Sequence, residues 1–133
     1  MTDQDGTGIR WGTVAFDTPD PRGLAQFYAA VLGWVVDPDE DDDDWVTLKG
    51  PKGEELAFQL APDLVPPDWP VGSVPQQAHL DLYVDSYDET EPLVLTLGAS
   101  VLDASENHPT FRVYADPSGH PFCLCIRAAV SGG

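Results

Sequence analysis

The sequence is poor in basic residues and lacks any long apolar run. Only six of its 133 residues are Lys or Arg, against 23 Asp or Glu, which gives a formal net charge of −17. A field of that sign repels phosphate backbones and anionic lipid, so we expect neither nucleic acid nor a membrane surface as a partner. The first residues contain neither a basic nor an apolar segment, and no run is long enough to span a membrane. We therefore expect a cytoplasmic protein without a signal peptide.

Cysteine is also scarce, because Cys123 and Cys125 are the only two. Both fall in a segment that alternates like a strand, where residues i and i+2 stand side by side on one face. Side chains in that arrangement do not converge as a disulfide requires. We therefore expect two free thiols in a reducing compartment.

One amphipathic helix is predicted early in the chain. Residues 10–17 alternate like a strand, and Asp20 then provides a typical N-cap with Pro21 at the first helical position. Gly33 is a typical helix stop. Between the cap and the stop, apolar residues recur at helical spacing: Leu24, Phe27, Tyr28, Val31 and Leu32.

The remaining elements are predicted from alternation and from turn residues. The first half adds two strands, at residues 45–48 and 55–60. The second half repeats the order with a strand, a helix and two strands, at residues 78–84, about 88–97, 111–114 and 122–126. Pro92 is expected near the first turn of the second helix, because a proline further inside would break it.

The two halves match at a constant shift of 66 residues. Turn residues coincide, since Pro51 falls on Pro117 and Gly53 falls on Gly119. Apolar strand positions coincide as well, in that Leu56 falls on Phe122. The matched order of strand, helix, turn and strand predicts an internal duplication of a βαβββ unit, with one strand of each unit poorly marked.

Three segments of this repeat carry a resemblance to a known family: FYAAVLGW after the first strand, HLDLYVD opening the second unit, and DPSGHPF before the last strand. Together they resemble the vicinal oxygen chelate superfamily, and within it the glyoxalase/bleomycin-resistance-like proteins. The likeness covers roughly residues 9–127. It implies one α+β domain over residues 1–133, with two tandem βαβββ modules that form a half-open mixed β-barrel around one cavity, helices outside. The modules would span about 9–61 and 76–127, joined by a Pro-rich connector at 62–75, and such proteins are often homodimers.

The resemblance also implies where a metal would be held. Enzymes of the superfamily usually place one ligand on the first and last strands of each unit, and the matching positions here are Thr13, Ala57, His79 and Cys123. Alanine has no donor atom and a neutral threonine hydroxyl is a weak ligand, which leaves His79 and Cys123, with Gln59 as a third candidate. We therefore predict no functional metal and no other cofactor; a divalent metal at His79 and Cys123 is the alternative.

The same positions supply the candidate site residues. His79, Cys123 and Asp81 are the candidate catalytic residues, because imidazole could activate the thiol and Asp81 could act as a base. The alternatives are that Cys123 is a buried apolar filler, His79 a hydrogen-bonded pocket residue and Asp81 a solvated carboxylate. The expected ligand-binding residues are Thr13, Ala57, Gln59, His79, Asp81, Cys123 and Trp69, the last placed on the connector at the cavity mouth.

Other polar features are expected to lie outside the site. The run at 37–44 has seven acids in eight residues but lacks the alternating ligands and the glycine of a calcium loop, so it is expected to be a solvated loop. His108 and His120 sit beside prolines in turns and are expected to be peripheral.

Three functions remain open from the sequence. The first is metal-independent binding of a small molecule, apolar or aromatic, in the cavity. The alternative is an enzyme of the same fold, a lyase, an isomerase or a dioxygenase-like protein that uses His79 with Asp81 or Cys123. The third is an interaction module whose cavity is vestigial. Fold alone does not choose among them.

Overall fold

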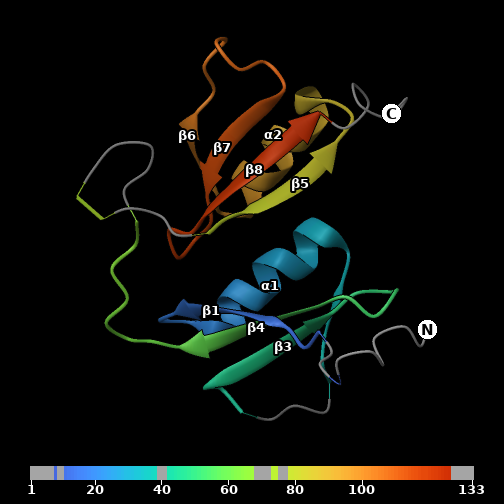
Figure 1. The fold of residues 1–133 in the computed structure, drawn as a ribbon, viewed down its shortest axis with the longest axis vertical. Coiled ribbons are helices and arrows are strands. Elements are labelled where there is room, and N and C mark those ends of the chain that lie inside the picture. The colour runs from blue at the N-terminus through green and yellow to red at the C-terminus, as the bar shows by residue number, and fades with distance from the viewer. Residues whose placement is uncertain (1–7, 9–10, 39–41, 68–72, 75–77, 127–133) are drawn as a thin grey trace.

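The protein is built from two tandem βαβββ modules, seen one above the other in Figure 1. The computed structural model describes residues 8, 11–38, 42–67, 73–74 and 78–126. The first module contains β1 (Val14–Thr18), α1 (Pro21–Leu32), β2 (Val35–Val36), β3 (Trp45–Lys49) and β4 (Glu55–Leu60). The second contains β5 (Leu80–Val84), α2 (Tyr87–Leu97), β6 (Ser100–Asp103), β7 (Phe111–Ala115) and β8 (Pro121–Ile126). The α+β class and the duplicated unit are confirmed.

Each module forms one four-stranded mixed sheet, and the strand pairing repeats at the predicted shift of 66. The orders are β1-β4-β3-β2 and β5-β8-β7-β6. Val14 pairs with Leu56 in the first sheet, and Leu80 pairs with Phe122 in the second. The hairpin turns repeat as well, since Gly53 and Gly119 have φ values of 89° and 93°. A positive φ of this size suits glycine, which has no Cβ to clash with the backbone.

The boundaries of α1 follow its predicted capping residues. The Asp20 side chain accepts a hydrogen bond from the Gly23 backbone N–H at 3.1 Å, and Pro21 occupies the first turn. At the other end, Gly33 is left-handed with φ 71°, and its N–H donates to the Ala29 carbonyl.

The predicted position of Pro92 in the second helix is wrong. Its N-cap is Ser86, whose side chain accepts a hydrogen bond from the Asp88 N–H, so the helix begins at Tyr87. Pro92 therefore lies inside the helix rather than in its first turn. The helix continues to Leu97 although Pro92 cannot donate a backbone hydrogen bond to the preceding turn. Two strand starts also move: β1 begins at Val14 and β5 at Leu80, which leaves His79 just before its strand.

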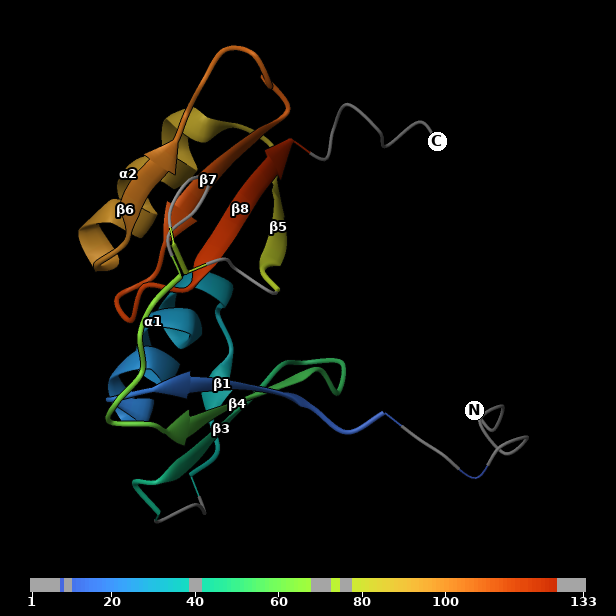
Figure 2. The ribbon, with the colours of Figure 1, turned by 60° about the vertical axis from the view of Figure 1, so that its left-hand side comes forward.

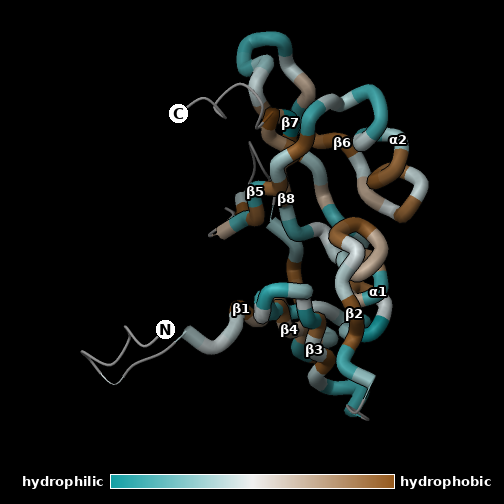
Figure 3. Tube along the Cα trace, turned by 90° about the vertical axis from the view of Figure 1, so that its right-hand side faces the viewer, coloured by the Kyte–Doolittle hydropathy of each residue, from teal (hydrophilic) through white to brown (hydrophobic). Residues whose placement is uncertain are grey.

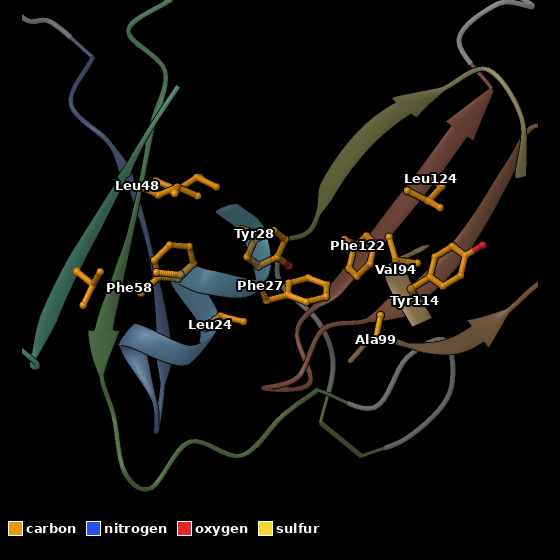
Figure 4. Close-up of a cluster of buried hydrophobic side chains, with 13 residues drawn as sticks. Leu24, Phe27, Tyr28, Leu48, Phe58, Val94, Ala99, Tyr114, Phe122 and Leu124 are labelled. Atoms are coloured by element: carbon orange, nitrogen blue, oxygen red, sulfur yellow. The ribbon is translucent and has the colours of Figure 1, made fainter. Parts of the chain in front are cut away.

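The modules are joined by an aromatic core contributed mainly by α1. Figure 2 shows α1 lying between the first sheet and the second module. Tyr28 stacks on Phe58 of β4 with ring centroids 5.9 Å apart, and its other side meets Phe122 of β8 at 6.2 Å. Phe27 also reaches Phe122, at 6.0 Å. Figure 4 shows these rings together with the leucines around them. One helix thus buries residues of both sheets in a single core.

A buried hydrogen bond reinforces this joint. The Tyr28 hydroxyl donates to Asp116 Oδ2 at 2.6 Å, across the two modules. Asp116 is only 4% exposed, and burial raises its pKa. Its other oxygen accepts from the backbone N–H groups of Ser118 and His120. The carboxyl group therefore has hydrogen bonds at both oxygens, as a buried polar group requires.

The two sheets are not closed into one another. Figure 3 shows β1, β4, β5 and β8 toward one side of the molecule and α1 and α2 toward the other. A single cavity enclosed by both modules therefore stays a prediction. Neither helix in the described ranges is long and apolar enough to cross a membrane.

His108 contacts residues at both ends of the loop between β6 and β7. Its ring stacks on Phe111 with centroids 4.1 Å apart. Nδ1 lies 2.9 Å from the Phe111 carbonyl oxygen and Nε2 lies 3.1 Å from Asp103 Oδ2. The Nε2 atom is buried and has no hydrogen-bond partner, so its contact with Asp103 is an ion pair that forms when the imidazole is protonated. The Phe111 carbonyl and then the Asp103 carboxylate raise the pKa of His108.

We expect Tyr28→Phe to lower the free energy of unfolding by about 1–3 kcal/mol, because it leaves a buried carboxylate oxygen without its donor. The measurement is urea unfolding. Tyr87→Phe is the matched control: its hydroxyl donates to the Pro109 carbonyl in an exposed position, so its loss is expected to stay below about 1 kcal/mol. Equal losses in the two variants would show that the Tyr28–Asp116 bond has no special role.

We expect Asp103→Asn to lower the pKa of His108, followed by NMR titration of the imidazole. Because the folded pKa is raised, the stabilisation from His108 is complete below the unfolded value of about 6.5 and is lost as the pH rises through the folded pKa. Glu106→Gln, an exposed change in the same loop, should leave the titration unchanged. A His108 pKa that does not respond to Asp103→Asn would contradict the assignment.

Candidate functional site

The candidate site lies on the face of the second sheet that points away from α2. In strand pairing, Asp81, Cys123 and Val113 form one row across β5, β8 and β7. Residues paired across strands share a face of the sheet. Cys123 is only 3% exposed, whereas Asp81 is exposed and lies on the edge strand β5.

The neighbouring row gives this face its aromatic character. It consists of Tyr83, Cys125 and Phe111, again paired across β5, β8 and β7. Tyr83 is 61% exposed and Phe111 is half-buried. Sequence reasoning did not assign Tyr83 and Phe111 to the site, although strand alternation places Tyr83 on the same face as Asp81.

Three of the predicted site residues, His79, Asp81 and Cys123, lie close together. His79 Nε2 lies 3.1 Å from Asp81 Oδ1. One donor atom each of His79, Asp81 and Cys123 all lie within 4.8 Å of one another. His79 and Asp81 are exposed while Cys123 is buried, so solvent reaches this group through His79 and Asp81.

The environment of the thiols favours their protonated form. Burial, followed by the nearby Asp81 carboxylate, raises the pKa of Cys123 to about 12. The same two causes raise the pKa of Cys125. Both effects disfavour a negative sulfur, and an activated nucleophile requires the opposite shift. The arrangement therefore favours a neutral Cys123 over a thiolate nucleophile.

The first-module members of the predicted site lie on the other sheet. Gln59 on β4 donates from Nε2 to Asp17 Oδ1 at 3.3 Å, within its own sheet. Ala57 is fully buried, and Thr13 precedes β1 with its hydroxyl donating to the adjacent Val14 carbonyl. Trp69 lies outside the described residues. A site that combines both modules therefore stays a prediction.

His120 has a structural contact that its position in a turn did not indicate. Its Nε2 lies 2.6 Å from the Asp17 carbonyl oxygen, and its ring packs on Phe16 with centroids 5.3 Å apart. It also borders a cavity of about 480 Å³ beside β1 and the connector. The contact joins the two modules, whereas sequence patterns mainly report neighbours within one element.

The cluster has the donor set of a transition-metal site. Imidazole nitrogen, carboxylate oxygen and thiol sulfur together suit a borderline-soft ion such as Zn²⁺. Three protein ligands with one open position is the number typical of catalytic zinc sites. Sequence reasoning counted only His79 and Cys123 in the second module. The structure adds Asp81, because the register places it opposite Cys123.

The paired βαβββ modules with open sheets are the fold of the vicinal oxygen chelate superfamily. Within that class, the model of the glyoxalase-like domain matches residues 13–125, and the chain belongs to this family. No curated protein matches the chain.

Several solved structures share the fold. One is a glyoxalase/bleomycin resistance protein/dioxygenase family enzyme from Burkholderia phytofirmans, 18% identical with a TM-score of 0.64, over 84% of this chain and 94% of that one. A protein from Agrobacterium tumefaciens is 22% identical with a TM-score of 0.65, over 89% and 97%. A glyoxalase-related enzyme from Fulvimarina pelagi is 21% identical with a TM-score of 0.61, over 88% and 87%. At these identities the likeness shows the fold alone.

We expect both thiols to remain protonated at neutral pH, so that the folded protein gives no thiolate ultraviolet absorbance there. Asp81→Asn should lower the pKa of Cys123, because it removes a negative charge beside the sulfur. The measurement is a thiolate absorbance titration of the folded protein, with Asp63→Asn as an exposed control in the connector. Thiolate absorbance near pH 7 in the unaltered protein would contradict this description.

Proposed function

We propose that this protein binds a small, apolar or aromatic molecule on the β5–β8–β7 face. The observation that carries the proposal is the juxtaposition on one face of a polar cluster, His79, Asp81 and Cys123, with the aromatic side chains of Tyr83 and Phe111. Binding sites commonly combine apolar walls with a few polar groups that fix orientation.

The roles of these residues follow from their chemistry. His79 and Asp81 face each other at 3.1 Å and supply an imidazole and a carboxylate acceptor to the polar end of a ligand. The protonated thiols add polarisable surface without charge. The net charge of −17 opposes the approach of anions, so neutral or cationic ligands are favoured.

Enzymatic activity is the second candidate, and the His79–Asp81 contact is the observation in its favour. An imidazole oriented by a carboxylate is a common general base, which suits a lyase or isomerase that moves a proton. A bound metal held by His79, Asp81 and Cys123 would supply Lewis-acid polarisation of a substrate oxygen. In this candidate the chain's own residues position the substrate and exchange a proton at the imidazole.

The assembly proposed here is a homodimer, in line with the resemblance to the superfamily, and the proposed location is the cytoplasm. Both proposals are independent of the binding site on the second sheet. Sedimentation of the purified protein would settle the first.

We expect aromatic metabolites or antibiotics that bind to raise the melting temperature of protein kept in chelator, and His79→Ala to abolish that rise. A ligand at a hundred times its Kd stabilises the folded state by about 2.7 kcal/mol. Asp81→Asn should weaken the same hits, while Asp63→Asn should leave them unchanged.

Hits that survive both site variants would place binding elsewhere and contradict the proposal. Turnover of a hit by the unaltered protein, lost in His79→Ala, would favour the enzymatic candidate instead.

A further inference from the structure

The β5–β8–β7 face carries an exposed carboxylate and no lysine or arginine. The side chain of Asp81 is 53% exposed at the edge of the face. Arg112 is the only Lys or Arg on the three strands, and its row continues to Leu124, on the α2 side of the sheet. There its guanidinium is 2.8 Å from Glu91. A ligand on the face that carries a negative charge therefore has no Lys or Arg from these strands to pair with, whereas a positively charged ligand has Asp81.

The Asp81 carboxylate has acceptor positions left for a ligand. His79 Nε2 lies 3.1 Å from one of its oxygens, Oδ1. An ionised carboxylate accepts at about four positions, so one imidazole does not saturate it. The nearby thiols of Cys123 and Cys125 are only weak donors. The N–H groups of an ammonium ion make stronger, charge-assisted hydrogen bonds to a carboxylate.

An aromatic row lies one step along the strands from Asp81. Tyr83 and Phe111 stand on either side of Cys125 in this row, and the Phe111 ring is held by its stacking on His108 at 4.1 Å. Positions two residues apart on a strand are separated by about 6.7 Å, a distance that an amine on a short carbon chain spans from its ring. Two strand spacings put the backbones of Tyr83 and Phe111 roughly 9.6 Å apart, which leaves room for one planar ring above the Cys125 thiol.

We propose that the ligand of this face is a small aromatic amine in its protonated form, with the ammonium group at Asp81 and the ring between Tyr83 and Phe111. The inference rests on the proposed function and narrows it to one chemical class. An aromatic carboxylate of the same shape would place a second negative charge beside Asp81. The net charge of −17 acts in the same direction over a longer range.

The experiment compares three compounds of similar shape: phenethylamine, phenethyl alcohol and phenylpropionate. Binding to reduced protein kept in chelator is measured by calorimetry at about pH 7, where the amine is protonated and the acid is ionised. We expect the amine to bind about tenfold more tightly than the alcohol, because a hydrogen bond between charged groups is stronger than a neutral one. The carboxylate should bind more weakly than either, and added salt should reduce the advantage of the amine.

Two variants separate the charge from the aromatic contact. Asp81→Asn should lower the affinity for the amine to about that of the alcohol and change the alcohol much less. Tyr83→Leu should weaken the amine and the alcohol by a similar factor. Asp88→Asn is the matched control, since it removes the same charge from an exposed position on α2, on the other side of the sheet, and should keep the advantage of the amine.

Equal affinities for the amine and the alcohol, or tighter binding of the carboxylate, would overturn this ligand class. So would an advantage of the amine that persists in Asp81→Asn, an exposed and nearly isosteric change. In each of these cases an aromatic compound still binds, so the proposed function would stand. Absence of phenethylamine binding at millimolar concentration would also overturn the inference, and the separate screen of aromatic compounds would then decide on the proposed function.

Discussion

Each module depends on the parallel pairing of its first strand with its last. Parallel neighbours cannot be joined by a tight turn, so the chain must cross over the sheet, and α1 and α2 begin that crossover. In the second module this pairing sets Asp81 directly opposite Cys123 while Leu80 and Leu82 point to the α2 side. A slip of one residue would send the leucines outward and the polar residues into the core. The register that builds the core thus also builds the candidate site.

The duplication provides an internal comparison for the site. At the positions of His79, Asp81 and Cys123, displaced by 66 residues, the first module has Thr13, Ala15 and Ala57. The first sheet forms with the same order and register although these positions carry no imidazole, carboxylate or thiol. Alanines suffice at the two equivalent strand positions of the first module, Ala15 and Ala57. Folding therefore does not require the cluster, which points to a functional reason for it.

Much of the architecture could be predicted because it is encoded locally and encoded twice. Alternation, the Asp20 and Gly33 helix ends, and the coincidence of turn glycines at 53 and 119 were enough to give the elements and their order. Short strands such as β2, with two residues, have too few positions for a pattern to show. Pro92 was misplaced because the helix start depends on Ser86, whose capping hydrogen bond outweighs the local signal of the proline.

The site was only partly predictable, for a different physical reason. Alternation grouped His79 with Asp81, and the family resemblance added Cys123 to that face, but a shared face does not give a distance. The separation of their donor atoms depends on which strand lies beside β5, and that is a tertiary property. The contacts of Tyr28 with Asp116 and of His120 with Asp17 join the modules, so no pattern within either unit could reveal them.

The charges near Cys123 disfavour its use as a thiolate nucleophile. A sulfur nucleophile needs a neighbouring positive charge, whereas Cys123 has the Asp81 carboxylate beside it in a chain whose net charge is −17. That environment holds the proton on sulfur as long as no cation is near. A face that is poorly arranged for thiolate attack on a substrate suits, for the same reason, the positive end of the ligand that we propose.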